Sequence, residues 1–361
     1  MNAKDGCFIP LPRWLCEQGP EADVVISTRC RLARNLSGYT FPWRADEMTR
    51  REVARLITVA ACNAGGDLSQ AICLDAELLS EAEHTRLIEW RYASGDWPRL
   101  RAGGRLLIPT NGICSVMVNE EEHLRVQAIL PGLQVESVLY TAEMTEDRLG
   151  STLAFARDRK TGYLTTSLSN AGAGLRISVL LHLPGLAVSD GLEEALDAAE
   201  GLGCAVRGLY GEGSSGAGEL YQISNSSIWG DDAVAVAHRV ASAVKWLIQS
   251  EREARQNLFD QDRGSRELAE AAKEALSMLL EQRVPSRKLL SIISVLRLAV
   301  SQGIMPGDLV QTSGWLAMAG PPEGDGINDQ NPYEWSRSRA IRQALQSNMK
   351  AIGTFYSFST E

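Results

Sequence analysis

Short apolar stretches separated by glycine-rich turns occupy the chain between residues 23 and 223, and several of them alternate apolar and polar positions. Alternation with a period of two is typical of strands that bury one face. This pattern predicts strands at Asp23–Ser27, Ile113–Val118, Ser151–Ala156, Ile177–His182 and Tyr221–Ser224. Apolar residues spaced by three and four positions predict helices over Glu47–Cys62 and Ser80–Tyr92. The first two thirds of the chain are therefore expected to form an α+β body.

The pattern changes after residue 227, where apolar residues recur mostly at helical spacing. A long helix is predicted to begin near Asp231 and Asp232, whose charges suit a helix N-terminus. Three more helical stretches follow, ELAEAAKEALSMLLEQR, SRKLLSIISVLRLAVSQG and YEWSRSRAIRQALQSNMKAI, interrupted by prolines and by the loop GPPEGDGINDQNP. We therefore predict a domain over residues 1–256 and a smaller all-helical domain over residues 257–361, with the boundary in a charged segment.

Acidic residues outnumber basic residues by 45 to 36, which gives a formal charge of −9 with histidine neutral. Proteins that bind phosphate backbones are usually basic, so a direct nucleic acid partner is not expected. No apolar run approaches the roughly 18 residues needed to cross a bilayer, and the N-terminal segment lacks the pattern of a signal peptide. The seven cysteines have no zinc-ligand spacing and are interpreted as reduced thiols. These features predict a cytoplasmic protein without membrane contacts.

Three arginines lie close together in the segment ISTRCRLARNL. Arg29 and Arg31 are two positions apart at the end of a predicted strand and therefore share a face, whereas Arg34 follows where the chain is expected to turn helical. Guanidinium groups on one face repel each other unless an anion lies between them, and their planar shape suits phosphate oxygens. The cluster indicates a polyphosphate site; a surface charge run paired with distant acids is the alternative.

The segment VMVNEEEHLRVQ places Glu120, Glu121 and Glu122 in a row, followed by His123 and Arg125. Adjacent carboxylates repel each other, and a neighbouring apolar strand implies that at least one of them is held in a defined place. A carboxylate that binds or deprotonates a cation would explain the run. A solvated turn at a strand end is the alternative interpretation.

Two glycine-rich segments complete the set of candidate site motifs. Asn170–Gly174 has two glycines at G-x-G spacing before Arg176 and an apolar strand, and RGLYGEGSSGAGELYQISN contains Arg207 and Glu212. Glycines let backbone N–H groups approach a phosphate closely, although neither segment is a Walker A or a dinucleotide motif. A flexible surface loop is the alternative for the second segment. Arginines together with glutamates, and no catalytic histidine motif or metal cage, indicate phosphoryl transfer.

At STRCRLARN, NEEEHLR, SNAGAGLR and RGLYGEGS followed by YQISN, the chain resembles the ATP:guanidino phosphotransferase (phosphagen kinase) family. The motifs occur in order over residues 23–255, and the resemblance is strongest to the bacterial branch that phosphorylates arginine in proteins. It implies an antiparallel β-sheet flanked by helices, with a smaller all-helical C-terminal domain. Like that branch, the chain begins only some two dozen residues before the first motif, without the N-terminal helical domain of the small-molecule kinases.

The resemblance also assigns roles to individual residues. The arginines that bind the ATP phosphates correspond to Arg29, Arg31, Arg125, Arg176 and Arg207. The acidic residues that engage the guanidinium correspond to Glu121, the proposed base, and Glu212, its orienting partner. The nucleotide-cradling backbone corresponds to Ser27, Thr28, Arg29, Cys30 and Arg31, to Arg176, Ile177, Ser178, Val179 and Leu180, and to Arg207, Gly208, Leu209, Tyr210, Gly211 and Glu212. The family implies ATP and Mg²⁺, although no aspartate cage is visible in the sequence.

The chain departs from the family pattern at three places. Ser167 stands where the family has a reactive cysteine, so its hydroxyl is the candidate for that catalytic role, and Leu168 replaces the usual proline. Arg91 stands near the expected position of a histidine beside the nucleotide base and is predicted to stack on adenine. In the C-terminal domain, Arg339–Ala344 is a degenerate match to a phosphoarginine-binding motif, so product sensing is not expected.

The resemblance implies a kinase that moves the γ-phosphoryl of ATP to arginine side chains in proteins, in a protein quality-control and degradation pathway. It also implies protein substrates with exposed arginine, a zinc-binding activator protein, a Clp-type protease system and a homodimer. The missing N-terminal helical domain favours a protein over a free guanidine as acceptor. The alternatives are a kinase for free arginine or another small guanidine, and a catalytically weak regulator that binds nucleotide or phosphoarginine.

Overall fold

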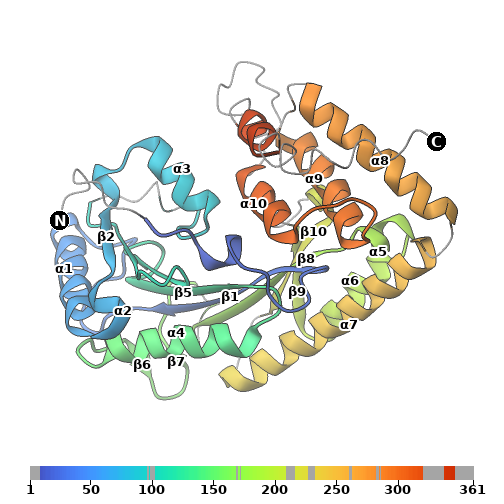
Figure 1. Cartoon of the computed structure of the whole chain (residues 1–361). Helices are drawn as coiled ribbons and strands as arrows, with labels where there is room; N and C mark the ends of the chain where they lie inside the picture. The colour runs from blue at the N-terminus through green and yellow to red at the C-terminus, as the bar shows by residue number, and fades with distance from the viewer. Residues whose placement is uncertain are drawn as a thin grey trace.

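The centre of the protein is a fully antiparallel sheet of eight strands in the order β2-β3-β4-β5-β1-β8-β10-β9 (Figure 1). The computed structural model describes residues 9–95, 97, 102–167, 170, 172–208, 216–226, 232–259, 262–281, 284, 286–319 and 337–345. The strands of this sheet are β1 (Val25–Arg34), β2 (Ile72–Asp75), β3 (Arg105–Ile108), β4 (Cys114–Val118), β5 (Leu124–Pro131), β8 (Leu175–His182), β9 (Cys204–Gly208) and β10 (Leu220–Asn225). A small hairpin is formed by β6 (Arg157–Asp158) and β7 (Gly162–Tyr163).

Helices cover both faces of the sheet. They are α1 (Glu47–Asn63), α2 (Gly66–Ser69), α3 (Glu81–Glu89), α4 (Val135–Gly150), α5 (Pro184–Val188), α6 (Leu192–Gly201), α7 (Ala233–Phe259), α8 (Asp262–Glu281), α9 (Ser286–Ser301) and α10 (Leu309–Ala319). Residues 337–345 are also helical. In Figure 1, α4 and α7 lie along one side of the sheet, and α9 and α10 lie on the other. The predicted α+β class, an antiparallel sheet with a helical C-terminal part, is confirmed.

Most of the predicted elements are present, but one predicted strand is wrong and several elements were not predicted. The helices predicted at Glu47–Cys62 and Ser80–Tyr92 correspond to α1 and α3, and α3 begins with a capping box in which Ser80 and Glu83 satisfy each other's backbone N–H groups. The predicted strand Ser151–Ala156 is wrong, because this segment follows α4 and forms an isolated bridge, from Phe155 to Leu36, beyond the end of β1. Helix α4 itself was not predicted.

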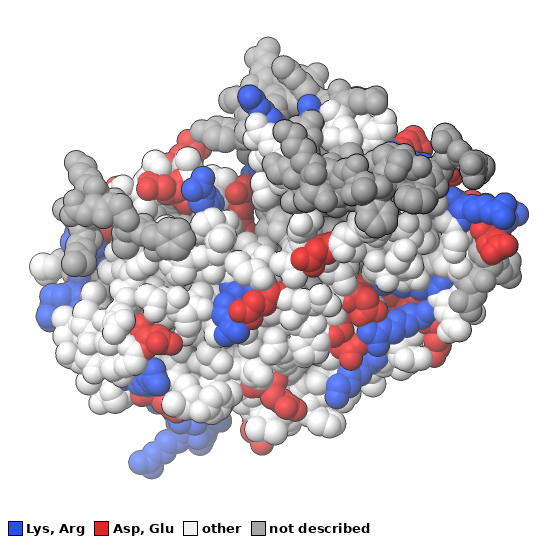
Figure 2. Space-filling model, in the orientation of Figure 1, with Lys and Arg blue, Asp and Glu red and all other residues white. Residues whose placement is uncertain are grey.

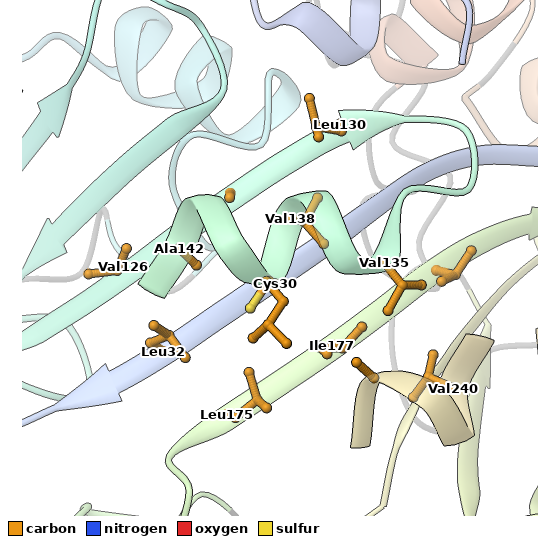
Figure 3. Packing of buried hydrophobic residues seen from close by; sticks show 14 of the residues in the cluster. Cys30, Leu32, Val126, Leu130, Val135, Val138, Ala142, Leu175, Ile177 and Val240 are labelled. Atoms are coloured by element: carbon orange, nitrogen blue, oxygen red, sulfur yellow. The ribbon is translucent and has the colours of Figure 1, made fainter. Parts of the chain in front are cut away.

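One face of the sheet carries the main hydrophobic core. Side chains from α1, α4, α6 and α7 pack here against alternate residues of β1, β5 and β8. Figure 3 shows α4 lying across these strands, with Val138 and Ala142 directed toward Cys30 and the sheet. Because side chains alternate along a strand, every second residue of β1 is committed to this core.

The opposite face is covered at its two ends and left open between them. At one end, Leu106, Ile108 and Met117 pack with Leu87 of α3. At the other end, Ile129, Leu180 and Leu220 pack against α8, α9 and α10. The middle of this face is therefore available for polar side chains, between α3 and the C-terminal helices.

The predicted domain boundary falls inside α7. Residues 256 and 257 belong to this helix, which ends at Phe259, and α8 begins at Asp262. Since α8–α10 share a hydrophobic cluster with β5, β8 and β10, the C-terminal helices pack directly on the sheet. The division into residues 1–256 and 257–361 remains a prediction.

Charged side chains on the face drawn in Figure 2 lie in small groups in which acidic and basic residues adjoin. The described residues of this face show no continuous basic area of the kind that binds nucleic acid. None of the described helices combines the length and the apolar character that crossing a membrane requires.

Candidate active site

The register of the sheet brings the arginines of separate motifs to one face. Arg31 on β1 is directly opposite Arg176 on β8, and Arg125 on β5 is offset from Arg31 by two positions of the β1 register. Arg29 lies one row further along β1, and Arg207 lies on the edge strand β9. Side chains of directly paired residues point to the same side of a sheet. Four motifs that are far apart in the sequence therefore meet on the open stretch of the sheet.

A cavity of ≈ 630 Å³ opens over this stretch. Its lining residues are Arg31, Ala33, Ser94, Glu120, Glu121, Arg125, Ser167, Asn170, Gly174, Arg176 and Arg207. Four of these side chains are arginines and two are glutamates, so the lining is net positive although the chain as a whole is acidic. A concave site with this charge favours a ligand with several negative charges.

Arg29 is not among the residues that line the cavity. Its Nε donates to Ser178 Oγ at 3.3 Å, and one of its terminal nitrogens donates to Gln222 Oε1 at 3.1 Å. Arg29 therefore links β1 to β8 and β10 beneath the cavity. Burial lowers the pKa of Arg29, and the positive charges of Arg31 and Arg91 lower it further.

The cluster of arginines is electrostatically unfavourable in the absence of an anion. Burial lowers the pKa of Arg31 to about 9, and the charges of Arg125 and Arg176 contribute to the shift, while Glu120 and Glu121 oppose it. Repulsion between like charges that is only partly compensated is a common feature of binding sites that are completed by a charged ligand. An anion placed between these side chains would remove the repulsion.

The three adjacent glutamates have three different environments. Glu120 is buried, and its carboxylate accepts from Arg125 Nη1 at 2.6 Å and from the hydroxyl of Ser94. Glu121 binds the other terminal nitrogen of Arg125, but its side chain is 41% exposed, against 3% for Glu120. Glu122 is buried away from the cavity and is bonded to Asn35. Only Glu121 thus combines a fixed position with a carboxylate accessible from the cavity.

Five lining residues were absent from the predicted set, namely Ala33, Ser94, Glu120, Asn170 and Gly174. Ser94 follows α3 in an irregular segment, where no periodicity reveals a facing direction. The other four lie inside motifs that the sequence analysis had singled out. Ser167 and Arg207, both predicted, do line the cavity.

Several residues of the predicted nucleotide-binding ranges have side chains that point away from the cavity, and the assignment of these ranges stays a prediction. Cys30, Ile177 and Val179 are buried in the core on the opposite face, and Figure 3 shows Cys30 and Ile177 beneath α4. Thr28 Oγ1 donates to the carbonyl of Gly132 at 2.6 Å on the same opposite side. Strand alternation is the cause, since these residues fall between Arg29, Arg31 and their counterparts on β8.

The expectation that the backbone of Ser27–Arg31 and Arg176–Leu180 cradles a nucleotide stays a prediction. Both ranges pair with strands on each side, so their N–H and C=O groups belong to the sheet ladders. Ser27 lies opposite Leu180 on the cavity side of the sheet, but Leu180 packs against the C-terminal helices. Gly208 ends β9 opposite Tyr221. These strands contribute to the cavity through alternate side chains.

Arg34 does not belong to the polyphosphate cluster. β1 continues to Arg34 instead of turning helical, and alternation places this side chain opposite Arg29 and Arg31. Its guanidinium is buried, forms a bidentate pair with Glu146 of α4 and lies 3.5 Å from the ring centroid of Tyr163. Arg34 therefore has a structural role between the sheet and α4.

Arg91 lies beside the cavity without lining it. Its guanidinium is 5.0 Å from the ring centroid of Trp14, and its backbone carbonyl accepts from Gln127 Nε2 at 2.6 Å. The residue has a left-handed backbone conformation, with φ of 59°. Its stacking partner in this structure is Trp14, and the predicted contact with adenine stays a prediction.

Four predicted residues of the glycine-rich loop, Leu209, Tyr210, Gly211 and Glu212, lie outside the described residues, as does Leu168. The degenerate motif Arg339–Ala344 is part of the helix formed by residues 337–345. Within it, Arg342 Nε donates to the carbonyl of Leu279 on α8 at 2.9 Å.

His123 of the NEEEHLR motif is a structural residue with a measurable effect on pH stability. Its Nδ1 accepts from the N–H of Leu36 and its Nε2 donates to the carbonyl of Thr40, both at 3.0 Å, which fixes the neutral form. Burial lowers the pKa of His123 to about 4. Since the unfolded chain takes up this proton near pH 6.5, we expect about 3 kcal/mol of stability to be lost between pH 6.5 and pH 4.

Urea unfolding at pH 7 and at pH 4.5 measures this effect. We expect His123→Gln to show a smaller fall in unfolding free energy than the wild type over this interval, with a residual fall from buried His182, whose pKa is also lowered by burial. His238 is exposed, so His238→Gln serves as the control and keeps the wild-type profile. Equal falls in wild type and His123→Gln would contradict the assignment.

The sequence family accounts for this arrangement of arginines and glutamates. The model of a family described as ATP:guanido phosphotransferase, C-terminal catalytic domain, matches residues 52–254, more than half of the chain. The chain belongs to the ATP:guanido phosphotransferase family. Members of this family transfer phosphoryl groups from ATP to guanidino groups, so the predicted family and the predicted enzymatic class are confirmed.

Curated relatives and solved structures extend this ATP:guanido phosphotransferase assignment. The protein-arginine kinase of Halothermothrix orenii is 35% identical over 306 residues, which cover 84% of this chain and 86% of that protein. The protein-arginine kinase of Desulforamulus reducens is 33% identical over 361 residues, covering 96% and 99%. The crystal structure of lombricine kinase matches with a TM-score of 0.57 at 24% identity over 69% of this chain and 72% of that chain. The last likeness shows that the fold is shared.

Proposed function

We propose that this ATP:guanido phosphotransferase is a protein-arginine kinase, which transfers the γ-phosphoryl of ATP to arginine side chains in proteins. The observation that carries the proposal is the juxtaposition, in one cavity, of Arg31, Arg125, Arg176 and Arg207 with the accessible carboxylate of Glu121. The first group suits a triphosphate, and the second suits a guanidinium. Curated relatives that cover most of this chain are named protein-arginine kinases, which supports arginine in proteins as the acceptor.

The arginine side chains bind and orient the phosphates in the proposed reaction, and Glu121 acts on the acceptor. A guanidinium has no free lone pair at neutral pH, so one of its N–H protons must leave as the N–P bond forms. Glu121 accepts that proton, while the bond from the γ-phosphorus to the ADP oxygen breaks and ADP leaves. The charge of the loose transition state spreads over the equatorial oxygens, where the arginines stabilise it.

The proposal includes Mg²⁺ bound with ATP. Mg²⁺ commonly binds through one or two carboxylates together with substrate phosphates, and Glu120 and Glu121 are the carboxylates that line the cavity. The described residues contain no cluster of three or more His, Cys, Asp or Glu side chains suited to a metal. The residues present therefore fit a cation that arrives with the nucleotide. When bound, it neutralises part of the phosphate charge.

Ser167 and Arg91 keep their proposed roles, in acceptor positioning and in contact with the adenine. Ser167 lines the cavity, which supports the first role. Glu212 stays the proposed orienting partner of Glu121 on the basis of the family pattern alone. The quality-control pathway, the zinc-binding activator, the Clp-type protease and the homodimer rest on the family resemblance as well, whereas the cytoplasmic location stays a prediction from the sequence.

A single incubation tests the proposed function against its alternatives. The protein is mixed with ATP, Mg²⁺ and an arginine-rich protein, and the products are analysed by mass spectrometry without acid treatment, because N–P bonds are acid-labile. Phosphoarginine in the protein is the expected result. Comparable rates on free arginine would favour a small-molecule kinase, and nucleotide binding without any transfer would favour a regulator.

Arg31→Gln tests separately how Arg31 affects the transfer rate and how it affects the stability of the ATP-free protein. We expect the transfer rate to fall by about 10²–10³-fold, the usual loss when one preorganised charge-stabilising group is removed. The unfolding free energy of the ATP-free protein is expected to stay equal or to rise, because Arg31 is held beside Arg125 and Arg176. Initial rates and urea unfolding measure the two effects. A strongly destabilised variant would contradict this description of the cluster.

A further inference from the structure

One threonine lies between two residues that line the cavity, Glu121 and Ser167. Thr166 immediately precedes Ser167, and its hydroxyl lies 3.1 Å from the carbonyl oxygen of Glu121 and 2.9 Å from Glu122 Oε2. The hydroxyl has one proton, so it serves one of these two acceptors at a time. The backbone N–H of Thr166 also donates to the carboxylate of Glu122, at 2.8 and 2.9 Å.

Glu122 is itself firmly held. Its side chain is fully buried, and Oε2 accepts from Asn35 Nδ2 at 2.5 Å. Asn35 directly follows β1, and its Oδ1 accepts from the backbone N–H of His123 at 2.9 Å. A buried carboxylate with this many donors is costly to move, because each lost bond leaves a desolvated polar group. Glu122 thus fixes Thr166 to the end of β1.

The bonds on the other side of Thr166 continue to Ser167. Thr165 Oγ1 donates to the carbonyl of Ser167 at 2.8 Å, and the N–H of Asn170 donates to the same oxygen at 3.0 Å. Ser167 and Asn170 both line the cavity, as does Glu121. Thr166 therefore joins Glu121 to Ser167, through its hydroxyl on the Glu121 carbonyl and through its peptide bond to Ser167.

We propose that Thr166, anchored by Glu122, is a positioning residue that sets the distance between Glu121 and Ser167 and so orients the guanidinium acceptor. This inference rests on the proposed function. Proton removal requires the base within hydrogen-bond reach of the acceptor, and a displacement of about 1 Å can cost about 10²-fold in rate. The phosphate-binding arginines are held by the ladders of β1, β5, β8 and β9, so Thr166 does not set their positions.

The test compares Thr166→Val, which removes the hydroxyl at nearly constant shape, with Thr166→Ser, which keeps it. We expect Thr166→Val to lower kcat at least about tenfold while the Kd for ATP stays at the wild-type value, and Thr166→Ser to recover most of the rate. Thr141→Val is the matched control, because the Thr141 hydroxyl bonds to the carbonyl of Ser137 one turn earlier in α4, away from the cavity lining. This control is expected to keep the wild-type rate.

Three results would overturn the inference: wild-type kcat in Thr166→Val, a parallel loss of ATP affinity and kcat, or no recovery in Thr166→Ser. If Thr166→Val does not fold, Glu122→Gln is measured instead. It is likewise expected to lower kcat while the Kd for ATP stays at the wild-type value. Absence of transfer by the wild-type protein itself would instead refute the proposed function, so the two failures are distinguishable.

Discussion

Replacing Glu121 by glutamine is expected to lower the rate of phosphoryl transfer to arginine by about 10²–10⁴-fold, the range lost with a general base. The amide keeps the size of the side chain and a hydrogen-bond acceptor, but it cannot take the proton that the guanidinium must lose. Acid-labile phosphate on an arginine-rich protein, formed with ATP and Mg²⁺, measures the rate. Arg125 keeps its bond to Glu120 in this variant, so the phosphate-binding side of the cavity is expected to persist.

A matched control separates this effect from the loss of a salt bridge. Glu17 pairs with Arg13 at the same i,i+4 spacing as Glu121 with Arg125, but on the surface. Glu17→Gln is therefore expected to retain full activity. Binding of ATP by Glu121→Gln, followed as a thermal shift, should equal that of the wild type. A variant that transfers phosphoryl groups at the wild-type rate would exclude Glu121 as the base.

Strand alternation could be read from the sequence for two neighbouring arginines, although the predicted strand ended before them at Ser27. Arg29 and Arg31 were predicted to share a face, and the register of β1 confirms it. The prediction for Arg34 failed because β1 was expected to end at Ser27. Once the strand extends to Arg34, alternation alone assigns this side chain to the opposite face.

Helix α4 was not predicted because a charged residue interrupts its apolar pattern. Val135, Val138, Leu139 and Ala142 have the spacing of a buried helical face, yet Glu146 occupies the next core position and interrupts the apolar pattern. Its charge is compensated by Arg34, a partner 112 residues away in the sequence. Local periodicity carries no information about such a pair, so the core position of Glu146 could not be recognised from the sequence.

The hydrophobic pattern of the sequence also could not distinguish the roles of the three adjacent glutamates. They occupy an irregular connection between β4 and β5, where neither period assigns a direction to a side chain. Glu121 was selected from the family resemblance, whereas the tertiary contacts distinguish it physically: Glu120 and Glu122 are buried, and Glu121 is exposed to the cavity. The convergence of arginines from β1, β5, β8 and β9 likewise depends on strand order, which motif spacing does not encode.

Removing the carboxylate of the buried pair by Glu146→Ala is expected to lower the unfolding free energy by about 3–5 kcal/mol. Arg34 and Glu146 are only 3% and 9% exposed, so the variant leaves a buried guanidinium that keeps carbonyl oxygens and the Tyr163 ring but loses its carboxylate. Urea unfolding measures the loss. Glu267→Ala breaks an exposed pair with Arg263 and is the control, with an expected change of about 0–1 kcal/mol.

The double variant Arg34→Met with Glu146→Leu tests separately what the buried ion pair contributes to stability and what Arg34 contributes to activity. Without an unpaired buried charge, most of the stability lost in Glu146→Ala is expected to return. Activity is expected to stay below the wild-type level, because the Arg34 guanidinium also donates to the carbonyl of Gly174, a lining residue of the cavity, at 3.0 Å. Full activity in the stable double variant would show that Arg34 contributes to packing and not to the site. Low activity with recovered stability would show that Arg34 positions Gly174 in the lining of the cavity.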